Sequence, residues 1–96
     1  MAALTYAQVK SSVLAEMKGR PNMWPVLIYK DFEGNYDWRV LSDCGPGDYV
    51  HKAVCYIQLK AVIKRGANGT LEVITDRAGM QKEISEGELE LVYGAF

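Results

Sequence analysis

The alternation of apolar and polar side chains in residues 55–64 constrains the fold more than any other feature of this sequence. The odd-numbered positions are all apolar, whereas most even-numbered ones are polar (Cys55, Ile57, Leu59, Ala61 and Ile63 against Tyr56, Gln58, Lys60, Val62 and Lys64). On a helix, successive residues are about 100° apart, so these apolar side chains would scatter around the axis. On a strand they share one face. We therefore predict that residues 55–64 form a strand.

The flanks of the same stretch support an alternative. Asp48 is a good helix N-cap, Lys64 and Arg65 suit a last helical turn, and Gly66 is a typical stop. A helix over 49–65 would give a two-layer α+β fold with the element order α-β-β-α-β-β.

A helix over residues 6–18 is predicted from its ends and from its spacing. Thr5 and Gln8 have the spacing of a capping box, in which each side chain accepts a hydrogen bond from the backbone N–H of the other residue. Gly19 and Pro21 follow the last turn and end the helix. The apolar residues in between recur at helical spacing and define the face that should be buried: Tyr6, Val9, Val13, Leu14 and Met17.

Two strands, 26–32 and 36–42, are predicted to form a hairpin. Gly34 and Asn35 tolerate positive φ and suit a tight two-residue turn between them. In that register Tyr29 lies opposite Val40, and the core-facing side is Leu27, Tyr29, Tyr36, Trp38 and Val40. The charged residues fall on the other side, which is expected to face solvent.

A second hairpin and further short strands are predicted in the remainder of the chain. Residues 66–69 form its loop, and residues 70–76 its return strand. A turn at 77–79 leads into a strand over Met80–Ile84.

One helical turn at 85–88 and a last strand over 89–93 complete the predicted elements. The expected fold is α+β and mainly β, a single domain over 1–96 in which helix 6–18 packs on a five- or six-strand antiparallel meander over 26–93. Turn signals recur about every 8–12 residues, which favours an SH3- or Sm-like small barrel or a strongly bent sheet.

Charge and cysteine content place the chain among cytoplasmic proteins. Its 96 residues carry 11 basic and 12 acidic side chains, so its net charge of -1 creates no global field for nucleic acid or an anionic membrane. No apolar run approaches the roughly 18–20 residues of a membrane-spanning helix. Residues 1–13 lack a secretion signal, and Cys44 and Cys55 have no metal-binding or redox spacing. We expect a cytoplasmic protein with free thiols and no membrane association.

Motifs for catalysis and cofactor binding are not found. The single histidine, His51, is four residues from Cys55, which on a strand is about 13 Å and too far for proton transfer. The serines lie in no nucleophile motif, and the nine glycines form no phosphate-binding loop. Residues 31–37 carry alternating oxygen ligands around a glycine but lack the closing glutamate of a calcium loop. We expect no enzymatic activity, no cofactor and no metal site.

The preferred functional interpretation is a non-catalytic module that docks to a protein partner or self-associates, in a regulatory or accessory role. Seven of the ten aromatic residues lie within residues 24–56, more rings than a core of this size buries, and surface aromatics are favoured interface anchors. We place the partner contacts on the connector before the first strand and on the acidic hairpin: Trp24, Asp31, Phe32, Glu33 and Asp37.

The alternative is a small β-barrel that binds nucleic acid. Lys52, Lys60, Lys64 and Arg65 would contact phosphates while Tyr56 stacks on a base. A steep fall of affinity with salt would distinguish this function from protein docking.

Overall fold

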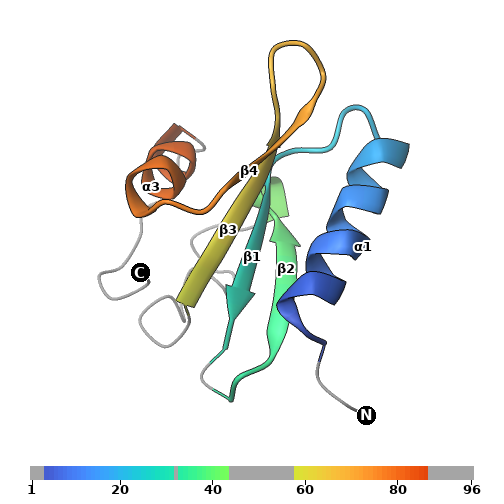
Figure 1. Cartoon of the computed structure of the whole chain (residues 1–96). Helices are drawn as coiled ribbons and strands as arrows, with labels where there is room; N and C mark the ends of the chain where they lie inside the picture. The colour runs from blue at the N-terminus through green and yellow to red at the C-terminus, as the bar shows by residue number, and fades with distance from the viewer. Residues whose placement is uncertain (1–3, 32, 44–57, 87–96) are drawn as a thin grey trace.

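The computed structural model describes residues 4–31, 33–43 and 58–86. The elements follow one another as α1 (Tyr6–Gly19), β1 (Val26–Lys30), β2 (Tyr36–Val40), the 3-10 turn η1 (Leu41–Asp43), β3 (Gln58–Arg65), β4 (Leu71–Ile74) and α3 (Arg77–Glu86) (Figure 1). The four strands form one antiparallel sheet with the order β2-β1-β3-β4. Neither α1 nor α3, the α-helices of the described residues, is long and apolar enough to span a membrane.

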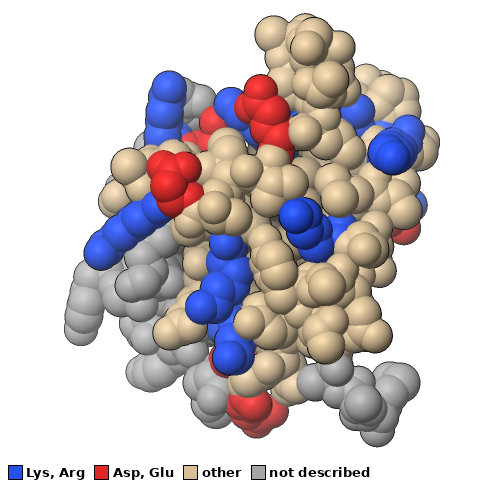
Figure 2. All heavy atoms as spheres, viewed as in Figure 1, with Lys and Arg blue, Asp and Glu red and all other residues tan. Residues whose placement is uncertain are grey.

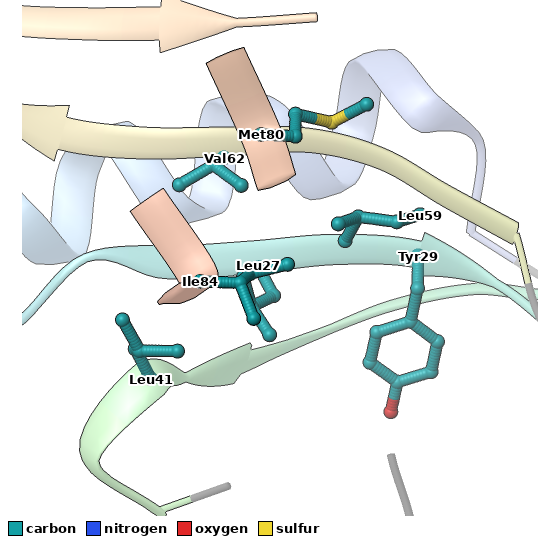
Figure 3. Close-up of a cluster of buried hydrophobic side chains, with 7 residues drawn as sticks. All are labelled: Leu27, Tyr29, Leu41, Leu59, Val62, Met80 and Ile84. Carbon is teal, nitrogen blue, oxygen red and sulfur yellow. The ribbon is translucent and has the colours of Figure 1, made fainter. Parts of the chain in front are cut away.

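Helices α1 and α3 cover opposite faces of this sheet (Figure 1). Under α1 lies one apolar cluster, made of Val9, Val13, Met17, Val26, Ile28, Ala61 and Ile63. Under α3 lies a second, made of Leu27, Tyr29, Leu41, Leu59, Val62, Met80 and Ile84 (Figure 3). β1 is therefore buried on both faces, which explains why residues 26–29 are an unbroken apolar run.

The predicted small barrel is wrong, because the described strands form an open sheet of four rather than a closed set of five or six. A barrel buries one face of its sheet around a single interior. Here a helix covers each face, so the apolar side chains of both faces are buried without closure. The broader prediction is confirmed: the fold is α+β, and the N-terminal helix packs on an antiparallel sheet.

The predicted N-terminal helix is confirmed and extends one residue further, to Gly19. Thr5 and Gln8 form the capping box: Thr5 N–H donates to Gln8 Oε1 over 2.8 Å, and Gln8 N–H donates to Thr5 Oγ1 over 3.2 Å. Val9, Val13 and Met17 are buried against the sheet, as their spacing predicts.

The first hairpin forms, but its predicted register is wrong. Val26 lies opposite Val40 and Ile28 opposite Trp38, so Tyr29 faces Asp37 instead of Val40. The hairpin loop sets this register. Asp31 N–H donates to Asn35 O over 2.9 Å, so the loop consists of the three residues between them. Gly34, at the end of this loop, has a positive φ of 91°, as in three-residue hairpin loops.

The register change redistributes the side chains of β1 and β2 between the two faces. Tyr36, Trp38 and Val40 lie on the α1 side, together with Val26 and Ile28. Leu27 and Tyr29, which the sequence placed with them, lie on the α3 side. Tyr29 lies opposite Asp37 instead of Val40, a shift of three residues, and an odd shift in register exchanges the faces of a strand.

β3 confirms the predicted strand over the described part of 55–64 and excludes the alternative helix over 58–65; residues 44–57 lie outside the described residues. The alternation is interrupted once. Ile28 pairs with Ala61 but Tyr29 pairs with Leu59, which leaves Lys60 as the extra residue of a β-bulge. Leu59 therefore packs under α3, whereas Ala61 and Ile63 pack under α1.

The second hairpin has the predicted loop and a shorter return strand, β4. Gly66 N–H donates to Thr70 O over 2.6 Å, and Gly69 N–H donates to Gly66 O over 3.0 Å. Gly69 has a φ of 84°, so this loop follows the same design as the one that ends at Gly34. Asn68 Oδ1 accepts the hydroxyl of Thr70 over 2.6 Å.

The predicted turn at 77–79 and strand over Met80–Ile84 are wrong, because these residues form α3. Asp76 begins the helix: its Oδ2 accepts Gly79 N–H over 2.7 Å, and its carbonyl accepts Met80 N–H over 3.0 Å. Met80 and Ile84 are four residues apart and both buried, the spacing of a helix face. The predicted turn at 85–88 lies partly within α3 and partly outside the described residues, and the predicted strand 89–93 lies wholly outside them.

Candidate docking surface at the end of α1

The connector between α1 and β1 is fixed at both ends by backbone hydrogen bonds. Arg20 N–H donates to Met17 O over 3.4 Å where the helix ends, and Met23 N–H donates to Arg20 O over 3.0 Å. At the other end, Leu41 N–H donates to Pro25 O over 2.7 Å and joins the connector to the end of β2. The segment between these bonds presents its side chains from a defined backbone.

The side chain of Arg65, on β3, also binds the start of this connector. Its Nη2 donates to the carbonyl of Met17 and to the carbonyl of Arg20, the latter over 3.0 Å. The last carbonyls of a helix have no partner within the helix, and a guanidinium with its several N–H groups suits them well. Arg65 thereby ties the end of α1 to the sheet.

Trp24 is the most exposed large apolar side chain of the described residues, with 57% of its surface accessible. It lines an open hollow of about 410 Å³ next to the connector. Four of the six lining residues are apolar: Pro21, Met23, Trp24 and Val40, with Arg20 and Asn22 as the polar ones.

A second open hollow, of about 490 Å³, shares Arg20 with the first. Glu16 and Trp38 line it together with small residues of α1: Ser12, Ala15 and Gly19. Arg20 Nε lies 3.2 Å from Glu16 Oε2, an exposed ion pair one helical turn apart. We call the residues around both hollows the Trp24 surface.

The predicted partner contacts do not form one surface. Trp24 precedes β1, whereas Asp31 and Glu33 lie in the hairpin loop at the other end of β1 (Figure 1). Asp31 Oδ1 accepts the N–H groups of Glu33 and Asn35, each over 2.9 Å, so this carboxylate organises the loop.

The other two predicted contacts also separate from Trp24. Asp37 lies on β2, where its Oδ1 accepts Trp38 N–H over 2.8 Å. Phe32 lies outside the described residues. Trp24, by contrast, borders the hollow next to the connector.

The predicted nucleic-acid contacts that the structure describes are largely engaged within the protein. Lys64 Nζ lies 2.6 Å from Glu83 Oε1, and Arg65 binds the carbonyls at the end of α1. Lys60 is the half-buried extra residue of the β-bulge, and Lys52 and Tyr56 lie outside the described residues. In the view of Figure 2, some basic side chains form a short connected run near the centre of the face, and the others are separated by uncharged and acidic side chains.

Tyr6, on α1, and Tyr36, on β2, form an aromatic contact in which the pKa of Tyr6 is shifted. Burial raises the pKa of Tyr6, and the neighbouring Tyr36 hydroxyl raises it further. The rings of these tyrosines meet edge-on with centroids 5.8 Å apart, and Lys30 Nζ lies 5.6 Å from the Tyr36 ring centroid. Residues 4–31, 33–43 and 58–86 contain no cluster of three or more His, Cys, Asp or Glu side chains that could hold a metal ion. His51 and Cys55 lie outside them.

Sequence reasoning missed the residues that accompany Trp24. Arg20 could have been identified from the sequence. A basic residue just after a helix can bind the last carbonyls of the helix or pair with an acidic residue one turn earlier. Val40 and Trp38 reach the surface through the register of β2, which depends on the hairpin loop. Arg65 is distant in sequence from the carbonyls that it binds, so no local pattern reveals its role.

No protein-family model matches this chain, and neither a curated protein nor a solved structure matches it.

Proposed function

We propose that this chain is a non-catalytic binding module that docks a protein partner on the Trp24 surface. The observation that carries the proposal is the exposure of Trp24, 57%, on a connector held at both ends by hydrogen bonds. Tryptophan is over-represented among the residues that dominate binding energy at protein interfaces. An exposed tryptophan on a fixed backbone costs little conformational entropy when a partner covers it.

The chemistry of the surface defines what a partner must supply. Pro21, Met23 and Val40 surround Trp24 with apolar area, so the partner should bring an apolar side chain into the hollow of about 410 Å³. Arg20, Glu16 and Asn22 provide the polar margin that surrounds the apolar centre of most interfaces. The engaged side chains of Lys64 and Arg65 give the nucleic-acid alternative less support.

The direct test is a binding measurement with a matched pair of surface variants. Partners are captured from the native host with the wild-type chain, and the affinity of the purified partner is then measured for Trp24→Ala and for Leu4→Ala. Leu4 is the other large apolar side chain exposed in the described residues, at 51%, and it lies before α1, far from the hollow. We expect Trp24→Ala to weaken binding about 30-fold or more, as for an interface anchor, and Leu4→Ala to leave it unchanged.

Equal binding of the partner by wild type and Trp24→Ala would overturn this assignment. Binding of a single-stranded oligonucleotide that weakens steeply with salt and survives Trp24→Ala would support nucleic-acid binding instead. A circular-dichroism spectrum of each variant shows that the fold is retained.

A further inference from the structure

Among the described residues, β4 has no strand on its outer edge, and the hydrogen-bond pattern of the second hairpin defines which backbone groups lie there. Gly66 N–H donates to Thr70 O, so the alternating pattern makes Lys64 with Glu72 the next hydrogen-bonded pair. The backbone N–H and C=O groups of Leu71 and Val73 then point away from β3. Among the described strands, none pairs with that side of β4, which ends the sheet.

The opposite end of the sheet, β2, is treated differently. By the same alternation, Trp38 directs its backbone N–H away from β1, and Asp37 Oδ1 accepts that N–H over 2.8 Å. A carboxylate that caps an outward N–H hinders another strand from pairing there. On β4 the charged residue is Glu72, and its carboxylate is directed over Gly66 of its own hairpin: Oε1 lies 2.8 Å from where a Cβ of residue 66 would be.

Apolar side chains adjoin the open edge on one face. Leu71 and Val73 lie on the α1 side of the sheet and are half-buried, because α1 packs mainly over β1 and β2 at the other end. Leu14 of α1 is half-buried on the same side. A strand added to β4 would therefore gain backbone hydrogen bonds and also cover these side chains.

We propose that the occupant is a second copy of this chain, paired antiparallel through β4 about a two-fold axis at Val73. Val73 then lies opposite Val73 of the second copy, Leu71 opposite Thr75, and Glu72 opposite Ile74. The outward groups of Val73 and Leu71 all gain hydrogen bonds across the axis. The alternative axis, at Glu72, would place two carboxylates directly opposite each other, which is unfavourable.

Self-pairing fits this edge better than an unrelated strand because the two surfaces are identical and complementary. Each copy contributes the same outward groups and the same half-buried Leu71 and Val73, as a two-fold interface requires. The segment Leu71–Ile74 contains no proline or lysine, the residues that commonly protect an edge. The four-stranded sheets of two copies would become one continuous sheet.

The test is the mass in solution of the full chain and of two proline variants. Val73→Pro removes an outward N–H that β3 does not use, so the hairpin can form while the edge is blocked. Ala67→Pro places proline in the exposed loop of the same hairpin and is the matched control. By light scattering at tens of micromolar, we expect wild type and Ala67→Pro near twice 10.7 kDa and Val73→Pro near 10.7 kDa.

Two results would overturn the proposal: a wild-type mass near 10.7 kDa up to about 0.5 mM, or a dimer that persists in folded Val73→Pro. If Val73→Pro fails to fold, Val73→Lys takes its place, since a charge at the edge opposes pairing of two copies. Trp24→Ala should remain dimeric and Val73→Pro should still bind a captured partner, so the dimer and the docking surface are tested separately.

Discussion

Gly79 controls the start of α3. Its N–H donates to Asp76 Oδ2, and a Cβ at this position would lie 2.8 Å from both carboxylate oxygens of Asp76 and from Ile74 Cγ2. Gly79→Ala must therefore displace the capping carboxylate, at about 0.5–2 kcal/mol. That loss is comparable to the roughly 1 kcal/mol that alanine contributes through helix propensity, and the close contact with Ile74 Cγ2 adds to it.

Gly19, at the end of α1, is the matched control, because nothing lies within 4 Å of a Cβ built there. We expect Gly19→Ala to raise the free energy of unfolding by about 0.5 kcal/mol and Gly79→Ala to fall at least about 1 kcal/mol below it. Urea unfolding of both variants measures the difference. An equal gain in the two variants would contradict the role of Gly79.

Single residues were predictable where their partners are close in sequence. The capping box of Thr5 and Gln8 needs only a spacing of three, and the structure has it as predicted. In the nucleic-acid alternative Lys64 and Arg65 contact phosphates, whereas in the structure they bind Glu83 and the carbonyls of Met17 and Arg20. Those contacts exist only after the sheet and both helices have assembled.

At the scale of elements, α3 is attached to the sheet by an ion pair as well as by its apolar face. Lys64 Nζ lies 2.6 Å from Glu83 Oε1, and the two side chains are 30% and 10% exposed. Glu16 and Arg20 form an exposed ion pair within α1, with side chains 42% and 69% exposed. The first pair is more buried and joins two elements, whereas the second is exposed and local, so their coupling energies can be compared.

We expect a double-mutant cycle of Lys64→Met and Glu83→Gln to give a coupling energy of about 1–2 kcal/mol, because less water screens this pair. The cycle of Glu16→Gln and Arg20→Met should give about 0.5 kcal/mol or less. Thermal or urea unfolding of each set supplies the values. Equal coupling in both cycles would show that Lys64–Glu83 contributes no more than a surface pair.

The helices and strands were predicted well where the apolar residues of a segment follow a single repeat, either helical or alternating. Helix 6–18 and the strand in 58–64 have clear periods, and both are confirmed. Met80–Ile84 was mistaken for a strand although Asp76, as an N-cap, and the spacing of Met80 and Ile84 indicate a helix. The stretch is short, and in so few residues the two periods are hard to separate.

At the scale of the whole molecule, the stability of the fold should depend on the ionisation of Tyr6. Burial, and secondly the Tyr36 hydroxyl, raise the pKa of Tyr6 in the folded chain above the usual value of about 10. Well below that pH the Tyr6 phenol is neutral in both the folded and the unfolded chain, and its contribution to the free energy of unfolding is complete. As the pH rises, the unfolded chain loses the proton first, so unfolding becomes more favourable.

We therefore expect the free energy of unfolding to fall between about pH 9 and pH 11, and to fall less in Tyr6→Phe. Wild type and Tyr6→Phe share every other side chain, so the difference between the two urea-unfolding series reports on Tyr6. Identical slopes would show that Tyr6 ionises alike in the folded and unfolded chains.

The overall architecture could be predicted only in part because it depends on which faces of the sheet are buried. The helix and the antiparallel strands follow from local patterns, but the sequence suggested one buried face and hence a barrel. The three-residue loop at 32–34 and one bulge at Lys60 redistribute side chains to both faces. Neither irregularity leaves a mark in the alternation that would locate it beforehand.

The helices that cover both faces of β1 limit where this protein can bind other molecules. Where β1 and the adjoining part of β3 are buried front and back, they leave no flat platform on which a base or a sugar ring could lie. Among the described residues, those open to another molecule lie outside this buried centre: in the loops, on the outer faces and ends of the helices, and along the flanks of the outermost strands. In a mutational scan, changes in the central strands should report on expression and folding, whereas those outside the buried centre should report on recognition.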